Sequence, residues 1–386
     1  MSFMQKNSYL RGILGGGMAF QLLLLLPGFQ LATASTCPSF LTPPFKSTAL
    51  NLPYQIYNLG PAFAQFWAEA QGKTFNEQLK SWNRLIEQPY QRFYDALVWE
   101  SDGKSDWFLD KYYQLQTFFA KLEQNPDLVL KMMQEFATFE EKIAINTAKF
   151  VKYFSDVNFP HAIYAAPAIK FDGKAYRDQV IGFGIDLLVE LNQKNFKINP
   201  QVLYTHELFH IYHARASQIQ KYARIANSPM FFLWQEGLAC YLSQLMNQPV
   251  SLLEVLFSQD LAQVSDDGIY WLAAKFLQEV NLASNSAQFK NWHSRWFKFY
   301  ESSPTGPDIP ARSGYLLGYR VAQLIAKYYS TNEMAHWNPG QTKAIVQQAL
   351  TILARQSKTI NKPANFYRPD NSTRPSCSKI SNLTKK

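Results

Sequence analysis

Residues 206–210, HELFH, have the types and spacing that could bind and use a metal ion. His206 and His210 are four positions apart, so on a helix both imidazoles project from one face and can bind the same ion. Glu207 is displaced round the helix toward the open side of that ion, where it can take a proton from an attacking water. Zinc suits imidazole ligands and an open position, so the motif predicts one zinc ion.

A catalytic zinc ion needs a third protein ligand, and Glu236 in WQEGLACYLS is the candidate. Asn199-Pro200 and Asn227-Ser228-Pro229 are start signals for two consecutive helices, because an Asn or Ser caps and a Pro suits the first turn. We therefore expect helices that begin at Pro200 and Pro229 and bring Glu236 to the two histidines. Two alternatives remain: HELFH is structural, or Glu236 pairs with a base.

HELFH followed by WQEGLACYLS resembles the gluzincin metallopeptidases, the class of thermolysin and the alanyl-type aminopeptidases, and in particular uncharacterised zinc-protease families of that clan. The resemblance covers roughly residues 180–330. The specific match to a WxxEGxAxY pattern, with one residue fewer between Trp and Glu, comprises Trp234, Glu236, Gly237, Ala239 and Tyr241.

The resemblance implies a zincin-like fold in which His206, His210 and Glu236 bind the zinc ion and Glu207 is the general base. It also implies that a hydroxyl in SGYLLGYRVAQLI stabilises the oxyanion, with Tyr315 as first choice and Tyr319 in reserve. Core packing is the alternative for both tyrosines. GFGID, residues 182–186, would be an edge strand along which a peptide substrate lies, with contacts from Gly184 and Ile185.

Two departures from the family pattern matter. The Gly-x-Met-Glu-Asn signature of the alanyl-type aminopeptidases is absent, which favours an endopeptidase or another specificity over that exopeptidase activity. Cys240 stands where thermolysin-like enzymes place the acid that orients the first histidine, so that partner must come from elsewhere. The apolar helical pattern round Cys240 instead predicts a buried free thiol.

Three other polar residues near these motifs have competing interpretations. His213 falls near the same helix face as His210, but a half-exposed surface histidine is the favoured interpretation over a substrate contact. Arg312 and Arg320 flank the two tyrosines and could bind a substrate carboxylate. Surface positions are the favoured interpretation for both arginines.

The elements that must position these residues are mainly helical. Three- and four-residue apolar spacings run from about residue 61 to 154 and resume after 199. Between them, HAIYAAPAIKF and QVIGFGIDLLVEL are strand-like and flank DGKAYRD, whose Asp172-Gly173 is a turn signal. We therefore expect a mainly α fold with a small antiparallel β-sheet (α+β): a helical region, 35–158, precedes a zincin-like catalytic domain, 159–355.

The two ends carry most of the charge. Residues 1–34 combine two bases, a short apolar stretch and an Ala-x-Ala ending, which predicts a signal peptide cleaved after Ala34 and export to the periplasm or medium. The alternative is an uncleaved membrane anchor. Residues 356–386 read as a basic, mobile tail with a charge of +6. Of the net +9, only +1 is left for residues 35–355, which argues against nucleic-acid binding.

Three cysteines are too few for a disulfide scaffold, although export would allow Cys37 and Cys377 to pair. No later segment is apolar enough to span a membrane, and the sequence does not indicate an oligomeric state. The predicted function is a zinc metallopeptidase that cleaves peptide or protein substrates. The alternatives are an exported zinc-binding protein without proteolytic activity, a helical interaction protein, and a hydrolase of non-peptide substrates.

Overall fold

The computed structural model describes residues 52–100, 107–176, 179–194, 196–222, 228–280, 286–298 and 309–368. The predicted signal peptide, its cleavage site and the pair Cys37 and Cys377 lie outside these ranges. In the part that is described, no helix has the length and apolar character that crossing a bilayer requires.

The described chain is mostly helical with one small sheet, as the sequence predicts. The helices of the first half are α1 (Gly60–Ala70), α2 (Phe75–Trp82), α3 (Gln91–Phe93), α4 (Trp107–Gln124), α5 (Pro126–Tyr153) and α6 (Ile185–Gln193), with π- and 3-10 turns η1 (Asn83–Glu87), η2 (Gln88–Tyr90) and η3 (Tyr94–Trp99). Those that follow are α7 (Pro200–Ala216), η4 (Ile219–Tyr222), α9 (Pro229–Met246), α10 (Leu252–Leu256), α11 (Gln259–Ala262), α12 (Asp266–Glu279), α13 (Ser286–Phe297), α14 (Ser313–Ile325), α15 (Thr331–His336) and α16 (Pro339–Ala354).

The sheet has four strands in the order β1-β2-β4-β3 and is mixed rather than antiparallel. The strands are β1 (Gln55–Asn58), β2 (Ala162–Ala166), β3 (Gly173–Tyr176) and β4 (Val180–Gly184). β1, β2 and β4 are parallel, and only β3 and β4 are antiparallel. The predicted antiparallel sheet is therefore wrong except for one pair of strands.

The local assignment between residues 170 and 191 also differs from the prediction. Asp172-Gly173 was expected to be a turn, but β3 begins at Gly173, and IDLLVEL is helix α6 rather than strand. The Asp186 carboxylate in α6 accepts N–H groups from Ala168 and Ile169 at 2.7 and 2.8 Å, which fixes the helix against the loop after β2. Leu and Glu favour a helix, and apolar runs this short do not distinguish helix from strand.

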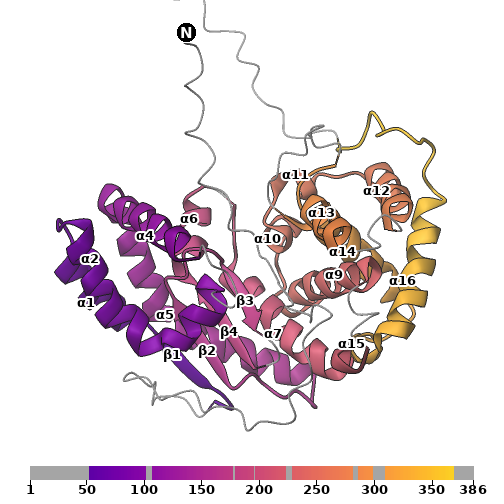
Figure 1. Ribbon diagram of the computed structural model, residues 1–386. Coiled ribbons are helices and arrows are strands. Elements are labelled where there is room, and N and C mark those ends of the chain that lie inside the picture. The colour runs from indigo at the N-terminus through magenta and orange to yellow at the C-terminus, as the bar shows by residue number, and fades with distance from the viewer. Residues whose placement is uncertain are drawn as a thin grey trace, which may run out of the picture.

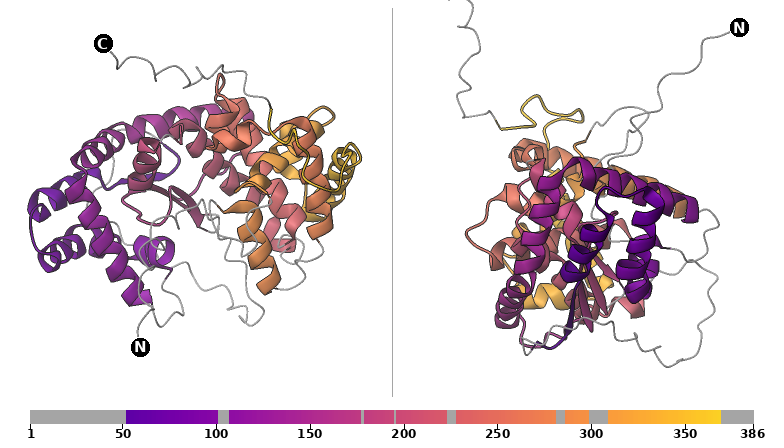
Figure 2. Two further views of the ribbon diagram at one scale, coloured as in Figure 1. Left: turned by 90° about the horizontal axis from the view of Figure 1, so that it is seen from above. Right: turned by 90° about the vertical axis from the view of Figure 1, so that its left-hand side faces the viewer.

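The molecule has two groups of elements that meet at α7 (Figure 1). Helices α1, α2, α4 and α5 lie with the sheet on one side, and α9 to α16 lie on the other. Seen from above, α1 and α2 are at the end opposite to α16 (Figure 2). β1 precedes residue 158 and pairs with β2, so the region expected to be helical supplies a strand of the same sheet.

Aromatic side chains fill the core of the first group. Trp82 is fully buried and its ring lies 5.3 to 5.9 Å from those of Phe66, Tyr94, Phe118 and Phe119. A buried side chain of this size stabilises the fold by roughly 1.5–3 kcal/mol. The aromatic-rich stretch from 63 to 154 is thus a helical core.

Part of the predicted tail packs on the second group. Phe366 is buried, its ring lies 5.8 Å from that of Trp271 in α12, and its carbonyl accepts the Ser265 N–H at 2.8 Å. The Trp271 indole donates to the Ile360 carbonyl at 3.0 Å. The described part of the tail, up to residue 368, therefore covers α12, and residues 369–386 lie outside the described ranges.

Helices α9 and α14 cross at two glycines with no side chain between them. A Cβ atom on Gly237 would lie 2.1 Å from the Gly318 carbonyl carbon, and one on Gly318 would lie 2.4 Å from the Leu233 oxygen. The main chains of the two helices therefore touch, and this contact sets their separation.

Replacing Gly237 with Ala is expected to lower the free energy of unfolding by about 3 kcal/mol, because the added methyl group must force the two main chains apart. Urea denaturation followed by circular dichroism measures this change. Gly340→Ala is the control, since its new Cβ would meet only the Asn338 side chain, at 3.2 Å. Equal effects of the two substitutions would contradict the close helix crossing.

Candidate metal centre

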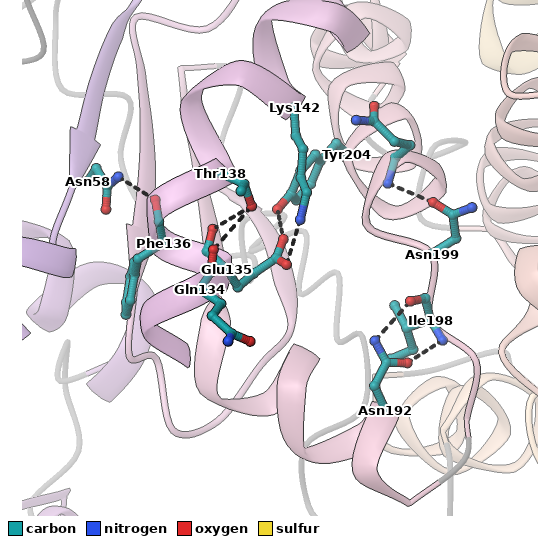
Figure 3. Close-up of polar contacts among 11 residues, drawn as sticks. Asn58, Gln134, Glu135, Phe136, Thr138, Lys142, Asn192, Ile198, Asn199 and Tyr204 are labelled. Carbon is teal, nitrogen blue, oxygen red and sulfur yellow. Dashed lines mark hydrogen bonds and ion pairs between the residues drawn. The ribbon is translucent and has the colours of Figure 1, made fainter. Parts of the chain in front are cut away.

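Helix α7 begins where the sequence predicts, and polar contacts fix its first turn. Asn199 is the N-cap, with its side-chain oxygen accepting the Gln201 N–H at 3.0 Å, and Pro200 opens the helix. Ahead of the cap, Asn192 accepts the Ile198 N–H and donates to the Ile198 carbonyl, at 2.6 and 3.0 Å (Figure 3). The segment that leads into the HELFH helix is thus anchored to the end of α6.

Helix α5 holds the next turn of α7. The Tyr204 hydroxyl donates to Glu135 at 3.1 Å, and Lys142 contacts the other oxygen of that carboxylate at 2.6 Å (Figure 3). Thr205 donates to Asn146 of α5 at 2.8 Å and accepts from Asn247, just after α9, at 2.7 Å. These bonds hold α7 between α5 and α9 immediately before His206.

Helix α9 also begins as predicted, with Ser228 as N-cap and Pro229 in the first turn. It brings Glu236 to the two histidines. His206 Nε2 lies 3.0 Å from His210 Nε2 and 3.2 Å from Glu236 Oε2, and His210 Nε2 lies 3.6 Å from the same oxygen. All three side chains are buried. Two imidazole nitrogens and a carboxylate oxygen therefore converge from two helices on one point.

The charges round this point favour a cation. Although burial raises it, the two histidines hold the pKa of Glu236 well below its usual range. Burial lowers the pKa of His206 to about 4. Against the same effect of burial, Glu236 holds the pKa of His210 above its ordinary value. Glu236 therefore supplies a negative charge where the three side chains meet.

Glu207 lies beside this group and faces strand β3. Burial raises its pKa to about 8, opposed by His210 and reinforced by Glu236 and Asp172. The Ala175 N–H of β3 donates to the Glu207 carboxylate. A Cβ atom on Gly173 would lie 2.9 Å from Glu207 Cγ, so only glycine lets the strand approach this closely. The predicted base therefore lies between the three candidate ligands and the edge of the sheet.

Three buried carboxylate oxygens in this region have no hydrogen-bond partner among the described residues. They belong to Glu207 (Oε2), Glu236 (Oε1) and Asp172 (Oδ2). Buried carboxylate oxygens are normally paired or coordinated to metals, because leaving them bare is costly. Their presence together indicates a site that binds positively charged or hydrogen-bond-donating groups.

Of the two predicted tyrosines, the structure brings Tyr315 to the candidate metal ligands. Its ring lies 6.3 Å from that of His206, and its hydroxyl interacts electrostatically with Glu236 and Glu207. Burial raises the pKa of Tyr315 well above its usual range, so the hydroxyl keeps its proton. Tyr319 instead donates to Gln244 of α9 and lies one turn further along α14.

Gly184 and Ile185 are not on an edge strand, contrary to the prediction. β4 lies between β2 and β3, and both residues are buried. A Cβ atom on Gly184 would lie 1.8 Å from the Phe171 carbonyl oxygen, so this glycine is needed for main-chain packing. The strand at the edge, next to Glu207, is β3.

Cys240 lies beside the outer nitrogen of the first histidine. Its Sγ atom is 3.9 Å from His206 Nδ1, and burial raises its pKa, so the sulfur stays a thiol. The thiol is free and buried, as the sequence predicts. Cys240 therefore contacts the histidine that an acid contacts in thermolysin-like enzymes, as a weaker partner.

The structure corrects two surface assignments. His213 is 0% exposed, with its ring stacked between those of Phe209 and Phe231 at 5.2 and 5.8 Å. Arg312 is 2% exposed and lies close enough to interact electrostatically with His206. Arg320, in contrast, pairs with Asp266 near the surface. Arginine side chains are mostly exposed, so the sequence alone could not predict that Arg312 is buried.

Sequence reasoning also missed two residues near the site. Asp172 is fully buried next to Gly173, and its burial raises its pKa to about 6 against the opposing charge of Arg312. His293 of α13 lies among Phe232, Phe289 and Phe297, close enough to Glu236 to interact with its charge. Neither residue belongs to a motif. Asp172 is also interpreted as part of a turn, which predicts a surface position.

Comparisons of this chain with protein-family models, with curated proteins and with solved structures find no match. What the geometry shows is a buried group, His206, His210 and Glu236, that could bind a metal ion. Within the described residues, it is the only group of three or more such side chains placed closely enough to do so.

Proposed function

We propose that this protein is a zinc metallopeptidase. The observation that carries the proposal is the convergence of His206, His210 and Glu236 from two helices, with Glu207 beside them and a strand edge next to Glu207. Each of these parts has a role in the hydrolysis of an amide bond.

The donor set fits zinc. Four ligands at about 2.0–2.1 Å in a tetrahedron are separated from one another by about 3.3 Å. The separations of 3.0, 3.2 and 3.6 Å among the three ligand atoms lie round that value. Three protein ligands leave a position open, as catalytic zinc sites do. When bound, zinc would polarise the scissile carbonyl and make a water molecule more acidic.

Glu207 would move the proton. Its buried carboxylate, with one oxygen unpartnered among the described residues, would accept a proton from the attacking water and pass it to the nitrogen of the leaving amine. A burial-raised pKa makes this carboxylate a stronger proton acceptor than an exposed one, provided that nearby positive charge keeps it ionised.

Tyr315 and β3 would hold the substrate. The protonated Tyr315 hydroxyl can donate a hydrogen bond to the oxygen of the tetrahedral intermediate. Among the described strands, β3 has one neighbour, β4, so the main-chain groups of its other edge that Glu207 does not occupy can pair with an extended peptide. Strand pairing recognises the main chain, which is the reason to favour peptides over other substrates.

Metal analysis combined with a cleavage assay tests the proposal. We expect about one zinc ion per chain and cleavage of a quenched fluorescent peptide library, because three ligands make a complete catalytic set. Treatment with 1,10-phenanthroline should abolish cleavage, and added zinc should restore it.

Either of two results would contradict the proposal. One zinc ion per chain without cleavage of any peptide would support the zinc-binding protein that is not an enzyme. No bound zinc, and no effect of the chelator, would support the helical interaction protein in which HELFH is structural.

A further inference from the structure

Arg312 is buried in an unusual position. It is the N-cap of α14, in the left-handed region at a φ of 61°, and its side chain is 2% exposed. Its Nη1 donates to the Leu256 carbonyl at the end of α10, at 2.7 Å. The main-chain conformation favours glycine or asparagine, so the contacts of the arginine side chain must offset that cost.

The guanidinium group lies on the ring of Tyr315. Its central carbon is 4.3 Å from the ring centroid, within the range of a cation–π interaction. Phe297 packs edge-on to the same ring at 5.6 Å, and the His206 ring is 6.3 Å away. Tyr315 is therefore confined by a cation, an aromatic ring and a metal ligand.

The charge of Arg312 also faces the acids of the site. Asp172, Glu207 and Glu236 are all buried here, and Arg312 interacts electrostatically with Asp172. A divalent ion would balance two carboxylates, and Arg312 would balance the third. Three carboxylates, one divalent ion and one guanidinium group together have no net charge. The positive charge of Arg312 is therefore compatible with a bound cation.

We propose that Arg312 is the positioning residue for Tyr315: its guanidinium holds the phenol ring in the orientation that presents the hydroxyl to the metal centre. This rests on the proposed function and adds to it a dependence of the oxyanion donor on a residue outside the ligand set. Arg312 touches neither substrate nor metal in this role, and acts through the ring.

Kinetics and zinc affinity together test this role. Tyr315→Phe should lower kcat about 100-fold, as loss of an oxyanion donor does. Arg312→Gln should lower kcat about 10-fold, with KM changed less than threefold, and the double variant should be no slower than Tyr315→Phe alone. Zinc affinity, measured by competition with a chelator, should stay equal or rise, because a positive charge near the ion has been removed.

NMR of zinc-loaded protein, with no substrate, gives a second readout. In protein with ¹³C-labelled tyrosine rings, the Tyr315 signal is assigned as the one missing in Tyr315→Phe. It should shift in Arg312→Gln and also in Arg312→Lys, whose ammonium cannot stack on the ring as a planar guanidinium does. Arg320→Gln is the matched control, an arginine of the same helix that pairs at the surface, and should leave the signal unchanged.

A Tyr315 signal at its wild-type position in a folded Arg312 variant would overturn the proposal. A loss of zinc affinity as large as the loss of kcat would also overturn it, because Arg312 would then support the whole metal centre rather than Tyr315 alone. If Arg312→Gln does not fold, Arg312→Lys decides by the same signal. If the wild-type protein cleaves no peptide, the proposed function fails, whereas the NMR comparison still decides the role of Arg312.

Discussion

Replacing Glu207 with Gln is expected to lower kcat about 10²- to 10⁴-fold while zinc stays at about one ion per chain. The amide is close in size to the carboxylate and can keep packing against Gly173, but it cannot accept the proton. Steady-state kinetics on a cleaved peptide, with metal analysis of the same sample, measures both quantities.

Glu333→Gln is the control for that experiment. Glu333 is exposed and belongs to the capping box of α15, where one side-chain oxygen accepts from Ser330, so glutamine serves as well and activity should stay within about twofold. Full activity of Glu207→Gln would remove Glu207 as the base. Loss of zinc from Glu207→Gln would show that the residue supports the metal rather than the proton transfer.

The pH profile has a defined sign. Glu207 accepts a proton only when ionised, and burial raises its pKa to about 8 in the absence of a cation. A bound divalent ion lowers that value, because it favours the charged carboxylate. Cleavage should therefore fall as the pH drops through the pKa of Glu207, and the acid limb should be absent from the residual activity of Glu207→Gln.

The second large effect is expected from the metal ligands. His210→Ala and Glu236→Ala should each weaken zinc binding about 10²- to 10³-fold or more, because a binding free energy of roughly 10–16 kcal/mol is divided among three or four ligands. In the wild type, zinc at 1,000 times its Kd should raise the free energy of unfolding by about 4 kcal/mol, and the variants should lose this gain. Thermal unfolding with and without zinc measures the difference.

His213→Phe is the matched control for the ligand variants. His213 is a buried histidine of the same helix, three residues after His210, and its ring already stacks between two phenylalanines. Neither of its ring nitrogens has a hydrogen-bond partner among the described residues, so an apolar ring should fit and zinc should be retained. Zinc retained by His210→Ala, or lost from His213→Phe, would contradict the assignment.

Zinc affinity should depend on pH in one direction. In the absence of metal, Glu236 holds the pKa of His210 above its ordinary value, so a proton competes with zinc for this nitrogen. Affinity should therefore be full above that pKa and fall below it, by up to about tenfold per pH unit for each displaced proton.

The chain's local signals predicted where two helices begin and which three side chains come together. HELFH and the two Asn/Ser-Pro caps depend on neighbours within one or two turns of helix, and both helices begin at the predicted prolines. Glu236 follows from the need for a third ligand. Such short-range patterns survive folding because they satisfy main-chain groups wherever the helix packs.

Long-range placement could not be predicted in the same way. The order β1-β2-β4-β3 depends on strands more than 100 residues apart in sequence, and strands of four or five residues carry too little alternation to specify their partners. Arg312 is buried because it contacts the Leu256 carbonyl and the Tyr315 ring. His213 is buried between two phenylalanine rings, one from its own helix and one from α9. Both residues are polar, so their type alone predicts exposure.

The contact between Gly237 and Gly318 has a consequence for the proposed active site. Glu236 precedes the first glycine and Tyr315 lies one turn before the second, so main-chain contact fixes the spacing between a ligand helix and the tyrosine helix. Thermal motion of side chains cannot alter that spacing. Any adjustment of the proposed substrate site must then come from the β3 side, while the spacing of Glu236 and Tyr315 stays constant.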